Sequence, residues 1–385
     1  MTEGINAAAR GDFEKAIAYF TDAINLDPAL AAAWLLRGRA FSASVSDILD
    51  TPEDFSDFVA IVPTGGISET QRAGYERAIA DFTEAIKLDP NLAPAFRDRG
   101  VALSYSGNHD MAMEDFNMAI SLTPNDPVPY RERGNLHDAA GDSELAMADY
   151  NRAINVAPND SWAYISRGSL HINTGNLDGA LTDYNEAIRL NPNATVNAEL
   201  FFDRGLLHIR TGDLDSALDD FTESLRLDPN NVKALGNRSY IHTKKGDFNL
   251  ALSDLNQAIG IEPDNVWAFN NRGKNHIHRG DFGRAIADYS QAIKLNPNNA
   301  EAFSSRGYIH IVMGNFSQAI SDLNQAIGIE PNNEAILALR GDVHARMGSL
   351  KLAASDLEAA LRIDPNNAHV GQMLAWLRTS MSEQC

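Results

Sequence analysis

Seven of the ten histidines recur at one place in a repeating pattern, at intervals of 34 residues with one interval of 37. They are His137, His171, His208, His242, His276, His310 and His344. A column of imidazoles could bind metal ions or exchange protons near neutral pH. However, zinc requires ligand nitrogens at about 2.0–2.1 Å, whereas neighbouring helices pack roughly 8–10 Å apart. We therefore interpret these histidines as partly buried, hydrogen-bonded core residues, and we expect no metal site.

Nine arginines and nine aspartates form two further columns in the same repeat. In units numbered from 1 to 34, the arginine is at position 7 and the aspartate at position 23. The arginines are Arg37, Arg99, Arg133, Arg167, Arg204, Arg238, Arg272, Arg306 and Arg340, and the aspartates are Asp81, Asp115, Asp149, Asp183, Asp220, Asp254, Asp288, Asp322 and Asp356. Such columns could form an arginine ladder for phosphate or carboxylate groups. The matching acid for every arginine favours ion pairs within each unit, with two parallel hydrogen bonds where the geometry allows them.

The sequence shows no constellation of residues that is typical of an enzyme. Serine and histidine recur with the repeat, and no glycine-rich loop could hold a phosphate group. The single cysteine, Cys385, is the last residue, where nothing would activate its thiol. We therefore expect a non-catalytic protein without a cofactor.

The elements that carry these columns are predicted from proline and glycine. A proline closes each unit, and the interval is 34 residues except for 62 between Pro28 and Pro90 and 37 between Pro192 and Pro229. Proline blocks continuation of a helix. Midway through each unit a glycine is followed by a residue that can cap the next helix. These caps are Asp12, Asn108, Asp142, Asn176, Asp213, Asp247, Asp281 and Asn315. Each unit is therefore predicted to be a helical hairpin.

Small residues mark the predicted contact between the two helices of a unit. Glycine stands at position 8 in most units, with Ser239 in one, and alanine at position 20, as in Gly134 and Ala146. An aromatic residue or leucine follows at position 24. This pattern resembles that of tetratricopeptide (TPR) repeats. The resemblance implies an all-α, right-handed α-solenoid of about ten helix-turn-helix units over residues 1–367, the first one incomplete. Residues 368–385 would form a C-terminal capping helix and tail.

The resemblance also implies a function, since TPR arrays bind peptides in a concave groove lined by the first helices. In units seven and eight this lining has no acidic residue, although the chain carries a net charge of −20. The candidate peptide-binding residues are Lys233, Asn237, Tyr240, Lys244, Trp267, Asn270, Asn271 and Lys274, with Ser305 and Tyr308 as an extension. Asparagine can pair with a peptide backbone, and lysine attracts carboxylates. We expect an extended or acidic peptide; the alternative is an ordinary solvated face.

The second unit contains an insertion of 28 residues, at about 44–71, between its two helices. It begins with acidic residues and continues with apolar ones, among them Phe55, Phe58 and Ile61. Long insertions in helical repeat proteins are often functional, so these three residues could form a docking site. We favour the alternative that the segment folds back on the array as a cover.

Composition narrows the class of partner. A net charge of −20 and a pI near 4.8 argue against nucleic acid and anionic lipid as partners. No stretch is apolar enough for a signal peptide or a membrane-spanning helix, so we expect a cytoplasmic protein. The main interpretation is a scaffold that binds other proteins. Two alternatives stay open: the recognition arm of a larger enzyme or secretion machine, and a structural protein that associates with itself.

Overall fold

The computed structural model describes residues 1–45, 67–191 and 197–383, and in these residues all regular structure is helical. The helices are α1 (Thr2–Ala9), α2 (Phe13–Leu26), α3 (Ala31–Val45), α4 (Glu69–Leu88), α5 (Ala93–Tyr105), α6 (His109–Leu122), α7 (Pro127–Ala140), α8 (Ser143–Val156), α9 (Ser161–Asn173), α10 (Leu177–Leu190), α11 (Asn197–Thr211), α12 (Leu214–Leu227), α13 (Val232–Lys245), α14 (Phe248–Ile261), α15 (Val266–His278), α16 (Phe282–Leu295), α17 (Ala300–Val312), α18 (Phe316–Ile329), α19 (Glu334–Arg346), α20 (Leu350–Ile363) and α21 (Ala368–Glu383).

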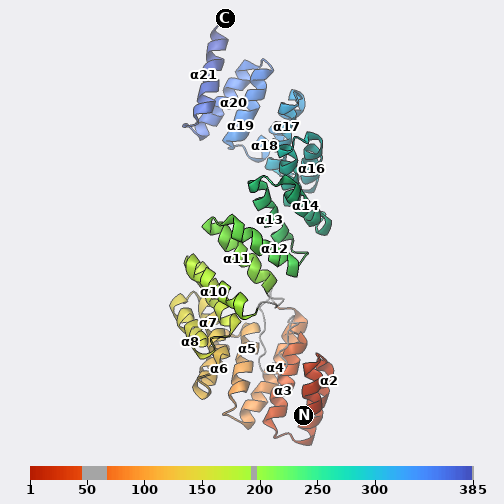
Figure 1. Ribbon diagram of the computed structural model, residues 1–385, viewed down its shortest axis with the longest axis vertical. Coiled ribbons are helices and arrows are strands. Elements are labelled where there is room, and N and C mark those ends of the chain that lie inside the picture. The colour runs from red at the N-terminus through yellow and green to blue at the C-terminus, as the bar shows by residue number, and fades with distance from the viewer. Residues whose placement is uncertain (46–66, 192–196, 384–385) are drawn as a thin grey trace. The chain divides into compact units, whose positions relative to one another are not determined.

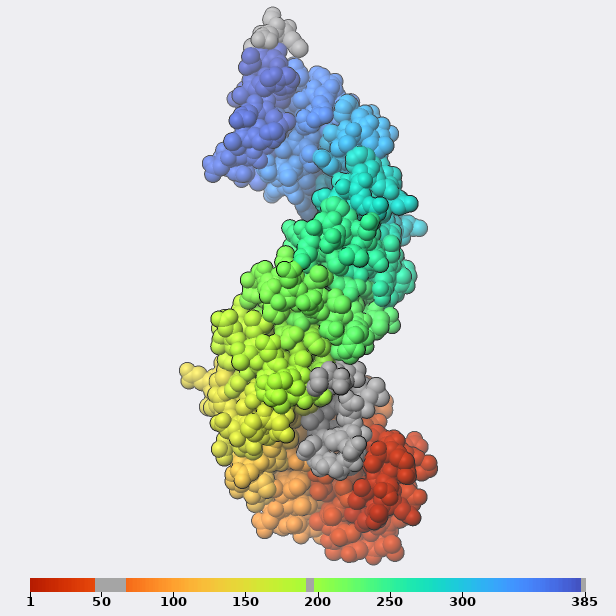
Figure 2. Space-filling model, viewed as in Figure 1, coloured from red at the N-terminus to blue at the C-terminus, as the bar shows by residue number. Residues whose placement is uncertain are grey.

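Consecutive helices pair into hairpins, α1 with α2, α3 with α4, and so on to α19 with α20. Within residues 1–191, and likewise within residues 197–383, each hairpin packs on the next one, as Figure 1 shows for the helices in chain order. The chain divides into two compact units, Met1–Ala194 and Thr195–Cys385. From here on, 'the first unit' and 'the second unit' mean these two parts of the chain, while the 34-residue repeats are called hairpins, or units in other phrases such as units seven and eight. The second unit is coloured from green to blue in Figure 2. The fold is therefore an α-solenoid of helix-turn-helix units, as the sequence predicts.

Apart from the turn between α3 and α4, most of which lies outside the described residues, the turns inside the hairpins follow the predicted glycine pattern. Gly141 and Gly246 end α7 and α13 with φ of 85° and 84°, a left-handed conformation that glycine adopts without steric cost. The predicted capping residues all occupy the N-cap position. The side chains of Asp12, Asn176, Asp213 and Asp281 accept a backbone hydrogen bond there. Those of Asn108, Asp142, Asp247 and Asn315 do not, so the prediction of side-chain capping is wrong for half of them.

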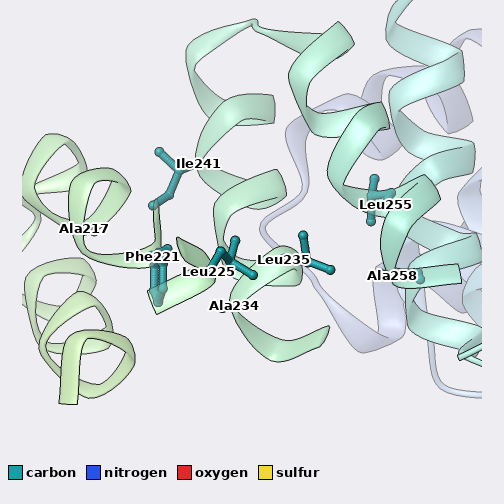
Figure 3. Close-up of a cluster of buried hydrophobic side chains, with 9 residues drawn as sticks. Ala217, Phe221, Leu225, Ala234, Leu235, Ile241, Leu255 and Ala258 are labelled. Atoms are coloured by element: carbon teal, nitrogen blue, oxygen red, sulfur yellow. The ribbon is translucent and has the colours of Figure 1, made fainter. Parts of the chain in front are cut away.

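The core of each hairpin is built where a small residue of the first helix meets a large residue of the second. A Cβ atom placed on Gly134 would lie 2.7 Å from Cε1 of Tyr150. Any larger residue would therefore push the two helices apart. Figure 3 shows a cluster that includes Phe221 and Leu225 of α12, Leu235 of α13 and Leu255 of α14. The apolar core thus continues from one hairpin to the next.

The arginine and aspartate columns form the predicted ion pairs in all nine units. Arg133, for example, donates from Nε and Nη2 to the two carboxylate oxygens of Asp149, at 2.8 and 2.6 Å. The nine aspartates are buried. The matching bonds join Arg37, Arg99, Arg167, Arg204, Arg238, Arg272, Arg306 and Arg340 to their aspartates. This column therefore belongs to the architecture.

The arginines also link neighbouring hairpins, which the sequence pattern does not reveal. Nη1 of Arg272 donates to Asn256 Oδ1 of the preceding hairpin, at 2.7 Å. The acceptor is always at position 25 and is serine, threonine or asparagine. The same link joins Arg37 to Thr21, Arg99 to Thr83, Arg133 to Asn117, Arg167 to Asn151, Arg238 to Thr222, Arg306 to Ser290 and Arg340 to Asn324. Each such arginine therefore stabilises one hairpin and joins it to its neighbour.

The histidine column lies beside the aspartate column inside the hairpins. Nε2 of His276 is 3.8 Å from Asp288 Oδ2, and four other histidines lie at 3.8–3.9 Å from their aspartates. The prediction of burial is confirmed for His242 and His276, which are 9% and 7% exposed. The prediction that these residues are hydrogen-bonded is wrong for the Nδ1 atom of three of them. Among the described residues, Nδ1 of His242, His276 and His310 is buried without a hydrogen-bond partner.

Helix α21 covers the end of the second unit. Val370, Leu374 and Leu377 are buried against α19 and α20, and Arg378 donates to Glu358 of α20 at 2.8 Å. Residues 46–66, which include Phe55, Phe58 and Ile61, lie outside the described residues. None of the helices described here is long and apolar enough to cross a membrane.

Candidate functional site

One face of α13 carries the first four predicted site residues. Lys233, Asn237, Tyr240 and Lys244 are spaced i, i+4, i+7 and i+11, so they form a single stripe along the helix. Three of them are exposed, and Asn237 is half-buried. Nζ of Lys244 lies 5.4 Å from the centre of the Tyr240 ring, a distance at which the ring attracts a cation. The stripe therefore combines positive charge with an exposed aromatic ring.

Trp267 of α15 rests on a glycine of α13. A Cβ atom placed on Gly236 would lie 2.9 Å from Cη2 and 3.0 Å from Cζ3 of the indole ring. The absence of a side chain at residue 236 thus makes the space that the ring occupies. Trp267 still has 46% of its surface exposed, so the ring is supported on one side and open to solvent on another. We call Lys233, Asn237, Tyr240, Lys244, Trp267 and Asn271 the α13–α15 surface.

The asparagines differ in what they can offer to a partner. Nδ2 of Asn237 donates to the backbone oxygen of Lys233, and Nδ2 of Asn271 to that of Trp267, both at 2.9 Å. Both side chains are only half-buried. Asn270 is 6% exposed, and its amide is already bonded on both sides, to Glu301 and to Asn299. The prediction that Asn270 contacts a peptide is therefore not supported by its position; its side chain joins α15 to α17.

Lys274 does not add free positive charge to this surface. It forms an ion pair with Glu301 of α17. The sequence shows no acidic residue on this face of units seven and eight, but the acid is supplied by the next unit. The paired charges of Lys274 and Glu301 largely cancel for a distant ligand. The strip of units seven and eight is therefore less basic than its own residues suggest.

An acidic patch borders the surface on the side of α11. Asp203 lies near Glu199 and near Lys233 of α13. Although part of the Asp203 side chain is exposed, the surrounding protein atoms and the charge of Glu199 raise the pKa of its carboxyl group to about 6, against the opposing effect of Lys233. This carboxylate competes with any acidic ligand for Lys233.

On the other side, α17 extends the surface with apolar residues. Tyr308 is 44% exposed and Ser305 is half-buried. Val312 and Met313, each 50% exposed, follow Tyr308 at the end of the helix. These two residues are not part of the lysine and amide pattern from which the sequence predicts the site. Apolar residues about one helical turn after Tyr308, on an otherwise polar predicted surface, are the sequence signal that indicates Val312 and Met313.

In the first unit, arginines at repeat position 5 form ion pairs within the protein. Arg97 donates to Asp98 at 2.9 Å and to Asp126 at 3.1 Å. Arg131 donates to Asp160 at 2.9 Å and is only 3% exposed. Burial alone would raise the pKa of Asp98, but the guanidinium groups of Arg39 and Arg97 outweigh it and lower this pKa. Charges here are satisfied within the protein, which leaves them little affinity for a partner.

No group of histidine, cysteine, aspartate or glutamate side chains within the described ranges has the geometry of a metal site. Five imidazoles of the histidine column face an aspartate that is already held by an arginine, as His276 faces Asp288. The described part of the predicted site is therefore a surface of aromatic, amide and lysine side chains in the second unit.

Several family models match the chain. Those described as tetratricopeptide repeat match residues 161–194 and 198–231, residues 1–43 and 306–368, and residues 98–126, 131–160 and 232–265. One described as TPR repeat matches residues 275–314. No curated protein shows significant sequence similarity.

Solved structures with a similar arrangement of helices share little sequence with the chain. YrrB, described as a TPR protein with an unusual peptide-binding site, is 23% identical and covers 49% of this chain and 96% of its own, with a TM-score of 0.46. MamA is 23% identical over 46% of this chain and 96% of its own, with a TM-score of 0.42. PilF of Pseudomonas aeruginosa is 17% identical over 56% and 96%, with a TM-score of 0.47. From the repeat models that match along its length, the chain belongs to the tetratricopeptide repeat family.

Proposed function

We propose that this protein is a non-catalytic scaffold that binds an extended, acidic segment of a partner protein on the α13–α15 surface. The tetratricopeptide repeats support a role in protein interaction. The observation that supports this place in particular is the seat of Trp267 on Gly236. A rigid aromatic ring that is held in place before binding loses little conformational entropy when a ligand contacts it.

The difference between the two units supports the same choice. In the first unit, arginines at repeat position 5, where Gly236 and Asn270 stand in α13 and α15, are buried in ion pairs such as Arg131 with Asp160. In the second unit, Tyr240 and Trp267 are 45% and 46% exposed. Aromatic residues of this kind are enriched among those that contribute most to protein interfaces. The lysines beside them would attract carboxylate groups of a partner.

A peptide selection tests the proposal. The full-length protein would be used to select binders from a random peptide library, and affinities would be measured by fluorescence anisotropy. We expect peptides whose binding is lost in Trp267→Ala. Trp162→Ala is the matched control, because Trp162 occupies the same repeat position in the first unit, and it should bind normally. If no peptide is selected, or if Trp267→Ala binds every selected peptide normally, the proposal is wrong.

A further inference from the structure

We infer that the partner segment carries two acidic residues about five positions apart, with an apolar side chain between them. This inference rests on the proposed function, because it describes the ligand of the same α13–α15 surface. It is drawn from the positions and partners of the lysines in the second unit. Two of the four lysines on α13 and α15 are available to a ligand, and they stand at the two ends of one stripe.

The available lysines are Lys233 and Lys244. Both are exposed, and neither forms an ion pair within 4 Å among the residues that the structure describes. By contrast, Lys245 pairs with Asp215 and Lys274 pairs with Glu301. A lysine held in an ion pair within 4 Å gains little from a second carboxylate, whereas Asp203 influences Lys233 without forming such a pair. An acidic partner is therefore expected to be recognised by Lys233 and Lys244.

The helix fixes the spacing of the two backbone positions that carry the ammonium groups. Lys233 and Lys244 are eleven residues apart on α13, which corresponds to about 16 Å at a rise of 1.5 Å per residue. An extended peptide advances by about 3.3 Å per residue. About five residues of such a peptide span the same distance. Two carboxylates with that separation can face both lysines when the peptide runs along the stripe.

The middle of the stripe carries aromatic rings beside Asn237. Tyr240 lies between the two lysines on α13, and Trp267 packs on Gly236 of the same helix. Both rings are nearly half exposed. Each aromatic ring loses contact with water when an apolar side chain covers it, which favours binding. The peptide residue that faces this part of the stripe should therefore be apolar.

The surroundings limit where further acidic residues can lie. Beyond Lys233, the carboxylates of Glu199 and Asp203 face the same region. A peptide with additional acidic residues on that side would meet these like charges, which weakens binding. The paired acids should therefore mark the ends of the charged part of the ligand.

Designed peptides test the inference. Each would be a labelled dodecamer of serine and glycine with one central leucine and two glutamates placed two, five or eight positions apart, and a fourth peptide would carry glutamine at both places. We expect the five-residue spacing to bind tightest by fluorescence anisotropy. Lys233→Gln and Lys244→Gln should each weaken it by about fivefold. Lys294→Gln, which removes an exposed lysine from α16, is the control and should bind normally.

The outcomes separate this inference from the proposed function. Equal binding of all three spacings, or normal binding by both lysine variants, would overturn the inference. The proposed function would still stand if library peptides bind the protein and lose affinity in Trp267→Ala. If no designed peptide binds and the library yields none that depends on Trp267, both the inference and the proposed function are wrong.

Discussion

Arg133 and Asp149 face each other across one hairpin and share two hydrogen bonds, of 2.8 Å from Nε and 2.6 Å from Nη2. Asp149 is 6% exposed, while the Arg133 side chain keeps 22% of its surface in contact with solvent. Hydrogen bonding to this carboxylate is also the main reason why the pKa of Arg133 is raised. Eight further hairpins repeat this relationship. Breaking one of the nine ion pairs by substitution therefore tests what the arginine–aspartate column contributes to stability.

Replacing Asp149 with alanine should destabilise the protein by about 3 kcal/mol, the lower end for a broken buried ion pair, because it leaves the Arg133 charge without its partner. Chemical denaturation monitored by circular dichroism measures this change. The control is Glu186→Ala, which removes the partner of Arg189 in an ion pair on the exposed face of α10. That variant should unfold at the same denaturant concentration as the parent protein. Equal effects of the two variants would contradict the structural role of the column.

The histidine column should make stability depend on pH. Burial lowers the pKa of His242, His276 and His344. Their ordinary value of about 6.5 applies in the unfolded chain. Below that pH the unfolded state binds more protons than the folded one, so the free energy of unfolding should fall as the pH falls from 7 to 5. A melting temperature that stays constant from pH 8 to pH 5 would contradict this prediction.

A triple variant identifies the source of the pH dependence. Replacing His242, His276 and His344 with asparagine removes the three groups that resist protonation. The melting temperature of this variant should change less between pH 7 and pH 5 than that of the parent protein. Because the variant could be less stable at every pH, the quantity to compare is the slope of melting temperature against pH, measured by calorimetry.

Two glycine substitutions should have opposite effects although their geometry is similar. A Cβ atom on Gly273 would lie 2.9 Å from Cζ of Tyr289, which is fully buried, so Gly273→Ala should destabilise by about 1–3 kcal/mol through overpacking. A Cβ on Gly236 lies equally close to Trp267, but this ring is half exposed and can move outward. Gly236→Ala should therefore keep or raise stability, since alanine favours a helix by about 1 kcal/mol.

Gly236→Ala should nevertheless disturb the α13–α15 surface. The displaced indole of Trp267 should change its fluorescence emission, and peptides selected on the parent protein should bind more weakly. Thermal denaturation, emission spectra and anisotropy measure the three effects on one sample. Unchanged emission together with unchanged peptide affinity would show that the seat of Trp267 on Gly236 does not prepare this surface for binding.

Asp203 should reduce the affinity for acidic peptides at neutral pH. Its pKa is raised to about 6, so the carboxylate is charged at pH 7.5 and becomes neutral near pH 5.5. Asp203→Asn should therefore strengthen binding of an acidic peptide at pH 7.5. The substitution should also reduce the gain in affinity between pH 7.5 and pH 6.5, a range in which anisotropy can be measured with the protein folded. Glu223→Gln, on the exposed part of α12, is the control and should leave both quantities unchanged.

Much of the fold could be predicted from the sequence, because the same residue types recur at the same position in many repeats. Gly134 with Tyr150, and Arg133 with Asp149, meet within one hairpin, so their repeat positions suffice to pair them. The link from Arg133 to Asn117 was not predicted. Its acceptor belongs to another unit and varies among serine, threonine and asparagine, which leaves no single residue type to follow.

The candidate site was harder to predict, because its properties depend on contacts between units. Lys274 looks free within its own unit, yet Glu301 of the next unit neutralises it. Asn270 has the polarity of a binding residue but lies buried between Asn299 and Glu301. The role of Gly236 also depends on a residue of another helix, Trp267. Residues that differ from unit to unit carry no repeat signal, so only the three-dimensional structure shows which of them meet.

The link through position 25 has a consequence for how such a chain changes in evolution. Every donor is the same arginine, and the three kinds of acceptor offer it a similar oxygen, as Asn256 does for Arg272 and Ser290 for Arg306. The same boundary chemistry is therefore found at eight boundaries between neighbouring hairpins within the described residues. A duplication or loss of 34 residues in frame would join ends that already fit, so the number of hairpins can change by recombination without any new interface having to arise.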